Sequence, residues 1–136
     1  MVKSWTDKLN AADEPKLKPS PRTFSDLIEG DSMLVPTARQ VDEFMRGIPP
    51  GKSMDVRTLR RGLALKHGAE VTCPVYTGYH LRTVAEAAHE ALERGAPLDE
   101  ITPFWRVLDD SVPTTGRLTF GADFVHQRRS EEGLPD

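Results

Sequence analysis

The sequence predicts a mainly α domain with a small β-hairpin, in the order of a winged helix-turn-helix. Residues 37–46, 56–67 and 77–95 each carry apolar side chains at spacings of three and four, the period of a helix with one buried face. Residues 104–108 and 118–120 are rich in aromatic and β-branched side chains and flank a turn-rich segment, which predicts a hairpin. A helix–turn–helix followed by a hairpin is typical of winged helices, whose second helix of the pair faces a duplex groove.

Capping residues mark the starts of the first two helices. Thr37 and Gln40 have the spacing of a capping box, in which each side chain accepts the backbone N–H of the other residue. Asp55 is placed to cap the helix over 56–67, and glycines follow the ends of both helices. These local signals predict where the first two helices begin and end.

The longest predicted helix spans 77–95, with Thr77 as its N-cap and Gly95 as its stop. Its first two turns carry Tyr79, His80 and Arg82, whereas its second half carries glutamates. Free N–H groups and the helix dipole favour anions at a helix N-terminus, so this end is suited to a phosphate backbone. The alternative interpretation is an ordinary amphipathic helix with a solvated polar face.

Two regions differ in composition. Residues 1–30 contain three prolines among lysines and polar residues, which predicts an extended N-terminal arm. Residues 31–134 form the predicted winged-helix domain, entered at 33–35 by a short strand or a packed segment. No apolar run is long enough for a membrane helix, and the N-terminus lacks the apolar core of a secretory signal. We therefore expect a cytoplasmic protein that does not bind a membrane.

The sequence contains no recognisable catalytic or metal-binding set. The single cysteine, Cys73, excludes an internal disulfide and a cysteine-cluster zinc site. The four histidines are scattered, and none has a partner at metal-ligand spacing on a shared helix face. The segment 50–53 contains Gly-Lys-Ser, but it lacks the strand and the upstream glycine of a phosphate-binding loop. We expect no metal, no cofactor and no enzymatic activity.

Charge is distributed unevenly along the chain. The net charge is −3, which argues mildly against a general nucleic-acid binder. Residues 46–66 nevertheless hold six cations against one anion, and residues 85–110 hold two cations against seven anions. This asymmetry predicts a basic side and an acidic side of the molecule.

Four short segments are similar to the landmarks of one protein family, in that family's order. They are Ile48-Pro49-Pro50-Gly51-Lys52, Leu81-Arg82-Thr83-Val84, Thr102-Pro103-Phe104-Trp105-Arg106-Val107, and Gln127-Arg128-Arg129 with Glu132-Gly133. Through them the chain resembles the C-terminal, DNA-binding domain of O6-alkylguanine-DNA alkyltransferases. It looks closer still to the alkyltransferase-like proteins, which keep that domain without the reactive cysteine. The resemblance covers residues 36–134 and implies a winged-helix fold that binds double-stranded DNA.

The resemblance also implies roles for individual residues. Arg82 would enter the base stack and fill the gap left by a flipped nucleotide; the alternative is a surface arginine paired with Glu86 at i,i+4. Four residues would line or brace the alkylbase pocket: Pro103, Phe104, Trp105 and Arg106. The alternative for the two aromatic rings is hydrophobic core. Phe104 stands where the family has its alkyl-accepting cysteine and Trp105 replaces the activating histidine, so no thiolate is available for alkyl transfer.

Two functions remain open at this point. The first is a non-enzymatic DNA-binding protein of the alkyltransferase-like type that recognises alkylated or flipped bases. In it, Lys52, Arg57, Arg60 and Arg61 would contact phosphates, and Thr77, Tyr79, His80 and Arg82 would lie at the groove. The second is a repurposed winged helix that binds a protein partner and no DNA. The acidic second half of the long helix and the net charge of −3 motivate this alternative.

Overall fold

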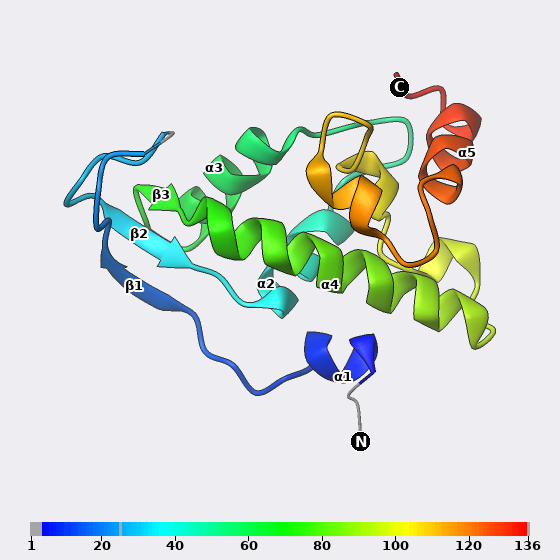
Figure 1. Cartoon of the computed structure of the whole chain (residues 1–136), viewed down its shortest axis with the longest axis horizontal. Coiled ribbons are helices and arrows are strands. Elements are labelled where there is room, and N and C mark those ends of the chain that lie inside the picture. Colours follow the sequence, from blue (N-terminus) through cyan, green and yellow to red (C-terminus); the bar gives the residue numbers. More distant parts are fainter. Residues whose placement is uncertain (1–3, 25, 136) are drawn as a thin grey trace.

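A computed structural model of the chain describes residues 4–24 and 26–135. The long helix α4 (Pro74–Glu93) runs through the molecule, and the other elements are arranged around it (Figure 1). The other helices are α1 (Trp5–Leu9), α2 (Ala38–Arg46), α3 (Val56–Lys66) and α5 (Asp123–Glu131), with 3-10 turns η1 (Leu98–Glu100), η2 (Phe104–Arg106) and η3 (Pro113–Arg117). The strands are β1 (Lys16–Pro19), β2 (Ser32–Val35) and β3 (Val71–Thr72). The prediction of a mainly helical protein with little β-structure is confirmed.

The three strands form one small mixed sheet in the order β1-β2-β3. Strand β2, which was predicted at 33–35, pairs antiparallel with β1 and parallel with β3, so that Leu34 lies opposite both Leu17 and Thr72. Met33 and Leu34 are buried, whereas all of β1 is exposed at the edge. Strand β3 leads through Cys73 directly into α4, so the sheet fixes the start of the long helix.

The predicted caps of α2 and α3 are present. Thr37 Oγ1 accepts the Gln40 N–H at 3.2 Å, and Gln40 Oε1 accepts the Thr37 N–H at 3.1 Å, which completes the capping box. Asp55 Oδ1 accepts the Thr58 N–H at 2.7 Å, and this bond is the main reason why the pKa of Asp55 lies below its usual value. Both helices therefore begin where their sequence signals place them.

The predicted start of α4 at Thr77 is wrong by one turn. The helix begins at Pro74, whose missing N–H and fixed φ suit the first helical position. Thr77 is fully buried inside the helix, and its hydroxyl donates to the Cys73 carbonyl at 2.7 Å. A Thr hydroxyl that bonds one turn backwards satisfies itself in mid-helix and caps nothing.

The predicted hairpin between 104–108 and 118–120 is also wrong. The first segment contains η2 and the second follows η3, and neither forms a strand. Phe104, Trp105, Val107 and Leu108 are all buried, so this segment lacks the alternation of a half-buried strand. Its aromatic and β-branched composition reflects core packing, because a short compact turn can bury every apolar side chain.

The core lies where α4 crosses α2, α3 and η2. Leu81 and Val84 of α4 are buried in one cluster with Met45 of α2, Leu63 of α3 and Phe104 of η2. The helix spacing expected for 77–95 therefore does bury its apolar face. Within the described part of the chain, none of the helices combines the length and the apolar character needed to cross a membrane.

The region predicted as an extended arm contains two ordered elements, α1 and β1. Ser4 caps α1 by accepting the Asp7 N–H at 3.0 Å. The Glu90 carboxylate of α4 then accepts the Trp5 N–H at 3.3 Å and the Thr6 N–H at 3.1 Å. The first turn of α1 is thereby attached to α4, although the two are about eighty residues apart in sequence.

Candidate nucleic-acid interface

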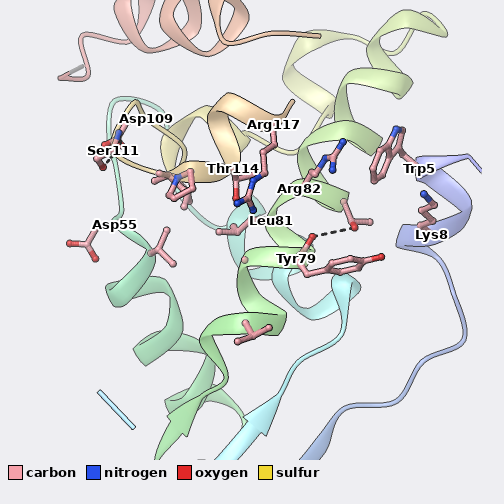
Figure 2. A pocket seen from close by; sticks show the side chains of 17 residues that line it. Trp5, Lys8, Asp55, Tyr79, Leu81, Arg82, Asp109, Ser111, Thr114 and Arg117 are labelled. Carbon is pink, nitrogen blue, oxygen red and sulfur yellow. Dashed lines mark hydrogen bonds between the residues drawn. The ribbon is translucent and has the colours of Figure 1, made fainter. Parts of the chain in front are cut away.

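A groove of about 870 Å³ runs across the first three turns of α4. Its walls come from four separate parts of the chain (Figure 2): α1, the start of α3, the first half of α4, and the segment that contains η3. The polar side chains that line it include Trp5, Lys8, Asp55, Tyr79, Arg82, Asp109, Ser111, Thr114 and Arg117. The end of α4 that the sequence assigned to a phosphate backbone therefore forms part of a real hollow.

Arg82 lies in this groove between the Glu86 carboxylate and the Trp5 ring. Its Nε lies 3.6 Å from a carboxylate oxygen of Glu86, and its guanidinium carbon lies 5.2 Å from the centre of the Trp5 ring. The Nε is buried and makes no hydrogen bond, the two terminal nitrogens make none to any residue that the structure describes, and the side chain is 39% exposed. The i,i+4 pair with Glu86 is thus present, but it leaves the donor-rich end of the guanidinium available.

Glu86 is itself fixed by Thr119, in the loop after η3. It is buried, and it accepts the Thr119 N–H at 2.9 Å and the Thr119 hydroxyl at 2.5 Å. These two hydrogen bonds keep the buried Glu86 carboxylate in a fixed position beside Arg82, because Glu86 cannot change its rotamer without losing both. The position of Arg82 is therefore set by contacts that extend to the loop after η3.

The two ends of the groove differ in charge. Lys8 and Arg82 lie at one end beside Trp5 and Tyr79, whereas Asp55 and Asp109 lie at the other end (Figure 2). Arg117 reaches in between them. An anionic ligand would accordingly bind nearer to the α1 end, where the carboxylates are distant.

Tyr79 and Gly78 give the α1 end an open floor. Tyr79 is 67% exposed and lines the groove. At Gly78 a Cβ would have no neighbouring atom within 4 Å, so the helix surface is bare there. A ligand can therefore approach the backbone of α4 closely at this point.

His80 and Thr77, which were expected beside Arg82, face elsewhere. The half-buried His80 ring donates from Nε2 to the Pro36 carbonyl at 2.9 Å, and burial lowers the pKa of His80 below its usual value. A neutral imidazole in this role is part of the fold. Thr77 is fully buried, so neither residue is placed at the groove.

The four cations expected to contact phosphates lie outside the groove, and one of them is buried. Arg60 is only 5% exposed and forms an ion pair with Asp26, so its expected role as a surface phosphate contact is wrong. Burial raises the pKa of Asp26, but the hydrogen bond and charge of Arg60 outweigh that effect and lower it. Lys52, Arg57 and Arg61 are exposed, but none of them lines the groove.

The residues expected to line an alkylbase pocket are packed into the core. Phe104 and Trp105 are buried, and the Phe104 ring lies 5.7 Å from that of Phe120 and 5.6 Å from that of Phe124. Pro103 is buried as well, and none of these residues lines the groove. The core alternative for the two rings is therefore the one that the structure shows.

Arg106 joins three of the four family-like segments. Its Nε donates to Glu132 Oε1 at 2.9 Å, and its NH1 donates to the Ile48 carbonyl at 2.7 Å. Glu132 also accepts the Trp105 indole N–H at 2.6 Å and the Gly51 N–H at 2.9 Å. Burial raises the pKa of Glu132, but these donors, led by Arg106, outweigh it and lower the pKa to about 2. Arg106 thus has a structural position and no pocket-lining one.

Trp5, Lys8 and Arg117 are among the groove residues that the sequence analysis missed. A local signal existed for the first two, because Ser4 and Asp7 have the spacing of a helix start. Trp5 and Lys8 then lie one turn apart, with the Lys8 ammonium 4.2 Å from the centre of the Trp5 ring. Nothing in the sequence around Arg117 points to the groove.

No group of three or more His, Cys, Asp or Glu side chains in the described part of the chain is arranged to hold a metal ion. Comparisons of the chain with protein-family models, with curated proteins and with solved structures found no match. The function is therefore argued from the geometry of the groove and from the family-like segments.

Proposed function

We propose that this chain is a non-enzymatic DNA-binding protein of the alkyltransferase-like type, which contacts double-stranded DNA through the groove along the first turns of α4. One observation carries the proposal: Arg82 lies in an open groove between the Glu86 carboxylate and the Trp5 ring, and its guanidinium makes no hydrogen bond to any described residue. A guanidinium held in this way can donate to a phosphate or a base edge with little further loss of freedom.

The order of the helices supports this reading. Helices α3 and α4 would form the helix-turn-helix pair, with α4 as the helix that meets the duplex. The Ile48–Lys52 turn, η2 and the end of α5 meet at Glu132, so three segments similar to the family landmarks form one structural unit. The proposal keeps this helix pair and gives up the wing that was expected at 104–120.

The same packing argues for binding without chemistry and without an alkylbase pocket. Phe104 occupies the position of the family's reactive cysteine and is completely buried. Cys73 belongs to a different apolar cluster, together with Leu27 and Met33, and it does not line the groove. We therefore expect the protein to bind plain and O6-alkylguanine duplexes with similar affinity.

The test is fluorescence anisotropy with a short labelled duplex. If Lys8, Arg82 and Arg117 each contact a phosphate, affinity should fall about fortyfold between about 50 and 200 mM salt. Arg82→Ala should weaken binding about tenfold and lower the salt slope by about one. Arg39→Ala is the matched control, because Arg39 is exposed on α2 outside the groove. Absence of binding at the lower salt concentration would overturn the proposal.

The alternative is a protein-interaction module, and one observation favours it. Val75 is 70% exposed and Tyr76 is 48% exposed on the first turn of α4, so this end of the helix presents apolar as well as cationic groups. A partner captured by the wild type and lost with Val75→Asp, together with no shift of any duplex, would favour this reading.

A further inference from the structure

We propose that Trp5 is a positioning residue for Arg82, so that the N-terminal helix α1 forms a working part of the binding groove. This inference rests on the proposed function of the groove. It assigns a role to a segment that lies outside the region resembling the alkyltransferase domain.

Helix α1 is docked at a defined place on α4. The Glu90 carboxylate accepts two backbone N–H groups at the start of α1 and the Thr6 hydroxyl at 2.7 Å, and these Thr6 bonds lead the effects that lower the pKa of Glu90. Leu9 at the end of α1 packs against the core. A five-residue helix is too short to be stable alone, so its order comes from this docking.

The docking at Glu90 places the Trp5 ring beside Arg82, about two helical turns earlier on α4. Glu90 lies four residues after Glu86 and eight after Arg82, so the three side chains follow one another along one side of α4. The Arg82 guanidinium then lies over the Trp5 ring (Figure 2), and its Nε lies 3.6 Å from the Glu86 carboxylate. The two terminal nitrogens of this guanidinium make no hydrogen bond to any described residue.

This arrangement is suited to ligand binding. An exposed arginine samples many rotamers and loses that freedom when it binds, which weakens association. A cation–π contact with an indole ring restricts the guanidinium beforehand without using any of its N–H donors. Trp5 therefore lowers the entropic cost of each contact that Arg82 makes with DNA.

The first test measures the free protein. In Arg-selective NMR of side-chain Nε–Hε groups, Trp5→Ala should move the Arg82 resonance out of the ring current of the indole and increase the mobility of that side chain. Phe24→Ala is the matched control and should leave the Arg82 resonance unchanged. The Phe24 ring makes the same kind of contact with another arginine, since the guanidinium carbon of Arg22 lies 5.0 Å from the ring centre, and Phe24 does not line the groove. An Arg82 resonance unchanged by Trp5→Ala would overturn the inference, whether or not DNA binds.

The second test is a double-mutant cycle in duplex binding. Trp5→Ala should weaken binding about two- to fivefold, and Trp5→Phe should recover most of that loss, because a ring face remains. In the Arg82→Ala background Trp5→Ala should have a clearly smaller effect, because only its contact with the Lys8 ammonium is then left to lose. Circular dichroism melts of every variant show whether the fold is retained.

The outcomes separate the inference from the function on which it rests. An equal loss in both backgrounds would mean that Trp5 contacts DNA independently, and unchanged or tighter binding would mean that α1 does not assist Arg82; either result overturns the inference. If wild type binds DNA but Arg82→Ala binds equally well, the proposed role of Arg82 fails instead. The NMR result on the free protein still decides whether Trp5 positions that side chain.

Discussion

The Nε of Arg106 lies 2.9 Å from Oε1 of Glu132, and this ion pair connects segments that are far apart in the chain. Both side chains are nearly buried, and Glu132 also receives the Trp105 indole N–H and the Gly51 N–H. The pair therefore ties η2 and the end of α5 to the turn that precedes α3.

The Glu132 pair predicts a loss of stability in acid. Its pKa is about 2 in the folded protein, against an ordinary value of 4.5. A depressed folded pKa contributes stability that is fully present above about pH 4.5 and is lost as the pH falls through about 2. The contribution should be roughly 2–3 kcal/mol. Urea unfolding of the wild type at several pH values in this window measures it.

Glu132→Gln is the control for that measurement. It cannot ionise, so the difference in unfolding free energy between wild type and variant should shrink as the pH approaches 2. Other carboxylates with lowered pKa, such as Asp26, contribute equally to both proteins and cancel. A difference that stays constant across the window would show that Glu132 is not the titrating group.

At Gly78 one substitution should raise stability and another should weaken duplex binding. The position is open, so Gly78→Ala should stabilise the protein by about 0.5–1 kcal/mol through helix propensity alone. Gly78→Glu should also fold, but its carboxylate would enter the groove and weaken duplex binding at least about tenfold. Ala12→Glu, an exposed position outside the groove, controls for the added charge. Equal binding by the two glutamate variants would place DNA elsewhere.

A substitution at Arg60 should instead lower the stability of the fold and leave duplex affinity unchanged. It is buried against Asp26, so Arg60→Ala should destabilise the protein by about 3–5 kcal/mol because it leaves the Asp26 carboxylate without its partner. Duplex affinity of the remaining folded protein should stay at the wild-type level. Thermal melts and anisotropy at a temperature well below the transition measure both quantities. A stable variant with weak DNA binding would restore Arg60 as a phosphate contact.

The burial of Phe104 predicts that a cysteine substituted at this position alone does not restore alkyl transfer. In Phe104→Cys the thiol would lie in the aromatic core, where burial disfavours the thiolate and the next residue in the chain is Trp105 in place of the family's histidine. Truncation of the ring should also cost about 3 kcal/mol. Intact mass spectrometry after incubation with an O6-alkylguanine duplex should show no added alkyl group. A mass gain would mean that the position is accessible to a base, against the packing seen here.

Local signals predicted the helices well. The Thr37–Gln40 box and the Asp55 cap depend on residues three apart, and such signals can be read directly from a sequence. The start of α4 was predicted wrongly because both Pro74 and Thr77 are residue types found in the first turn of a helix. In the structure the Thr77 hydroxyl donates to the Cys73 carbonyl, one turn earlier. Composition failed at 104–108, because the same aromatic and β-branched side chains serve a strand and a fully buried turn.

The site was predicted only in part, because its partners are remote in sequence. Arg82 and Tyr79 were found from the position of the long helix. The burial of Arg60 depends on Asp26, 34 residues earlier, and the setting of Arg82 depends on Trp5, which docks through Glu90, 85 residues later. No local pattern contains such pairings. Residue spacing alone therefore predicted a solvent-exposed Arg60 and gave no role to the residues of α1.

The most direct test of the account is an NMR titration of the isotope-labelled protein with a short unlabelled duplex at low salt. We expect the largest shift changes in the backbone of Gly78 and Tyr79 and in the side-chain Nε–Hε group of Arg82, with smaller changes at Lys8 and Arg117. Changes confined to the β1–β2 sheet, or none at saturating duplex, would contradict the proposal that DNA binds along the first turns of α4.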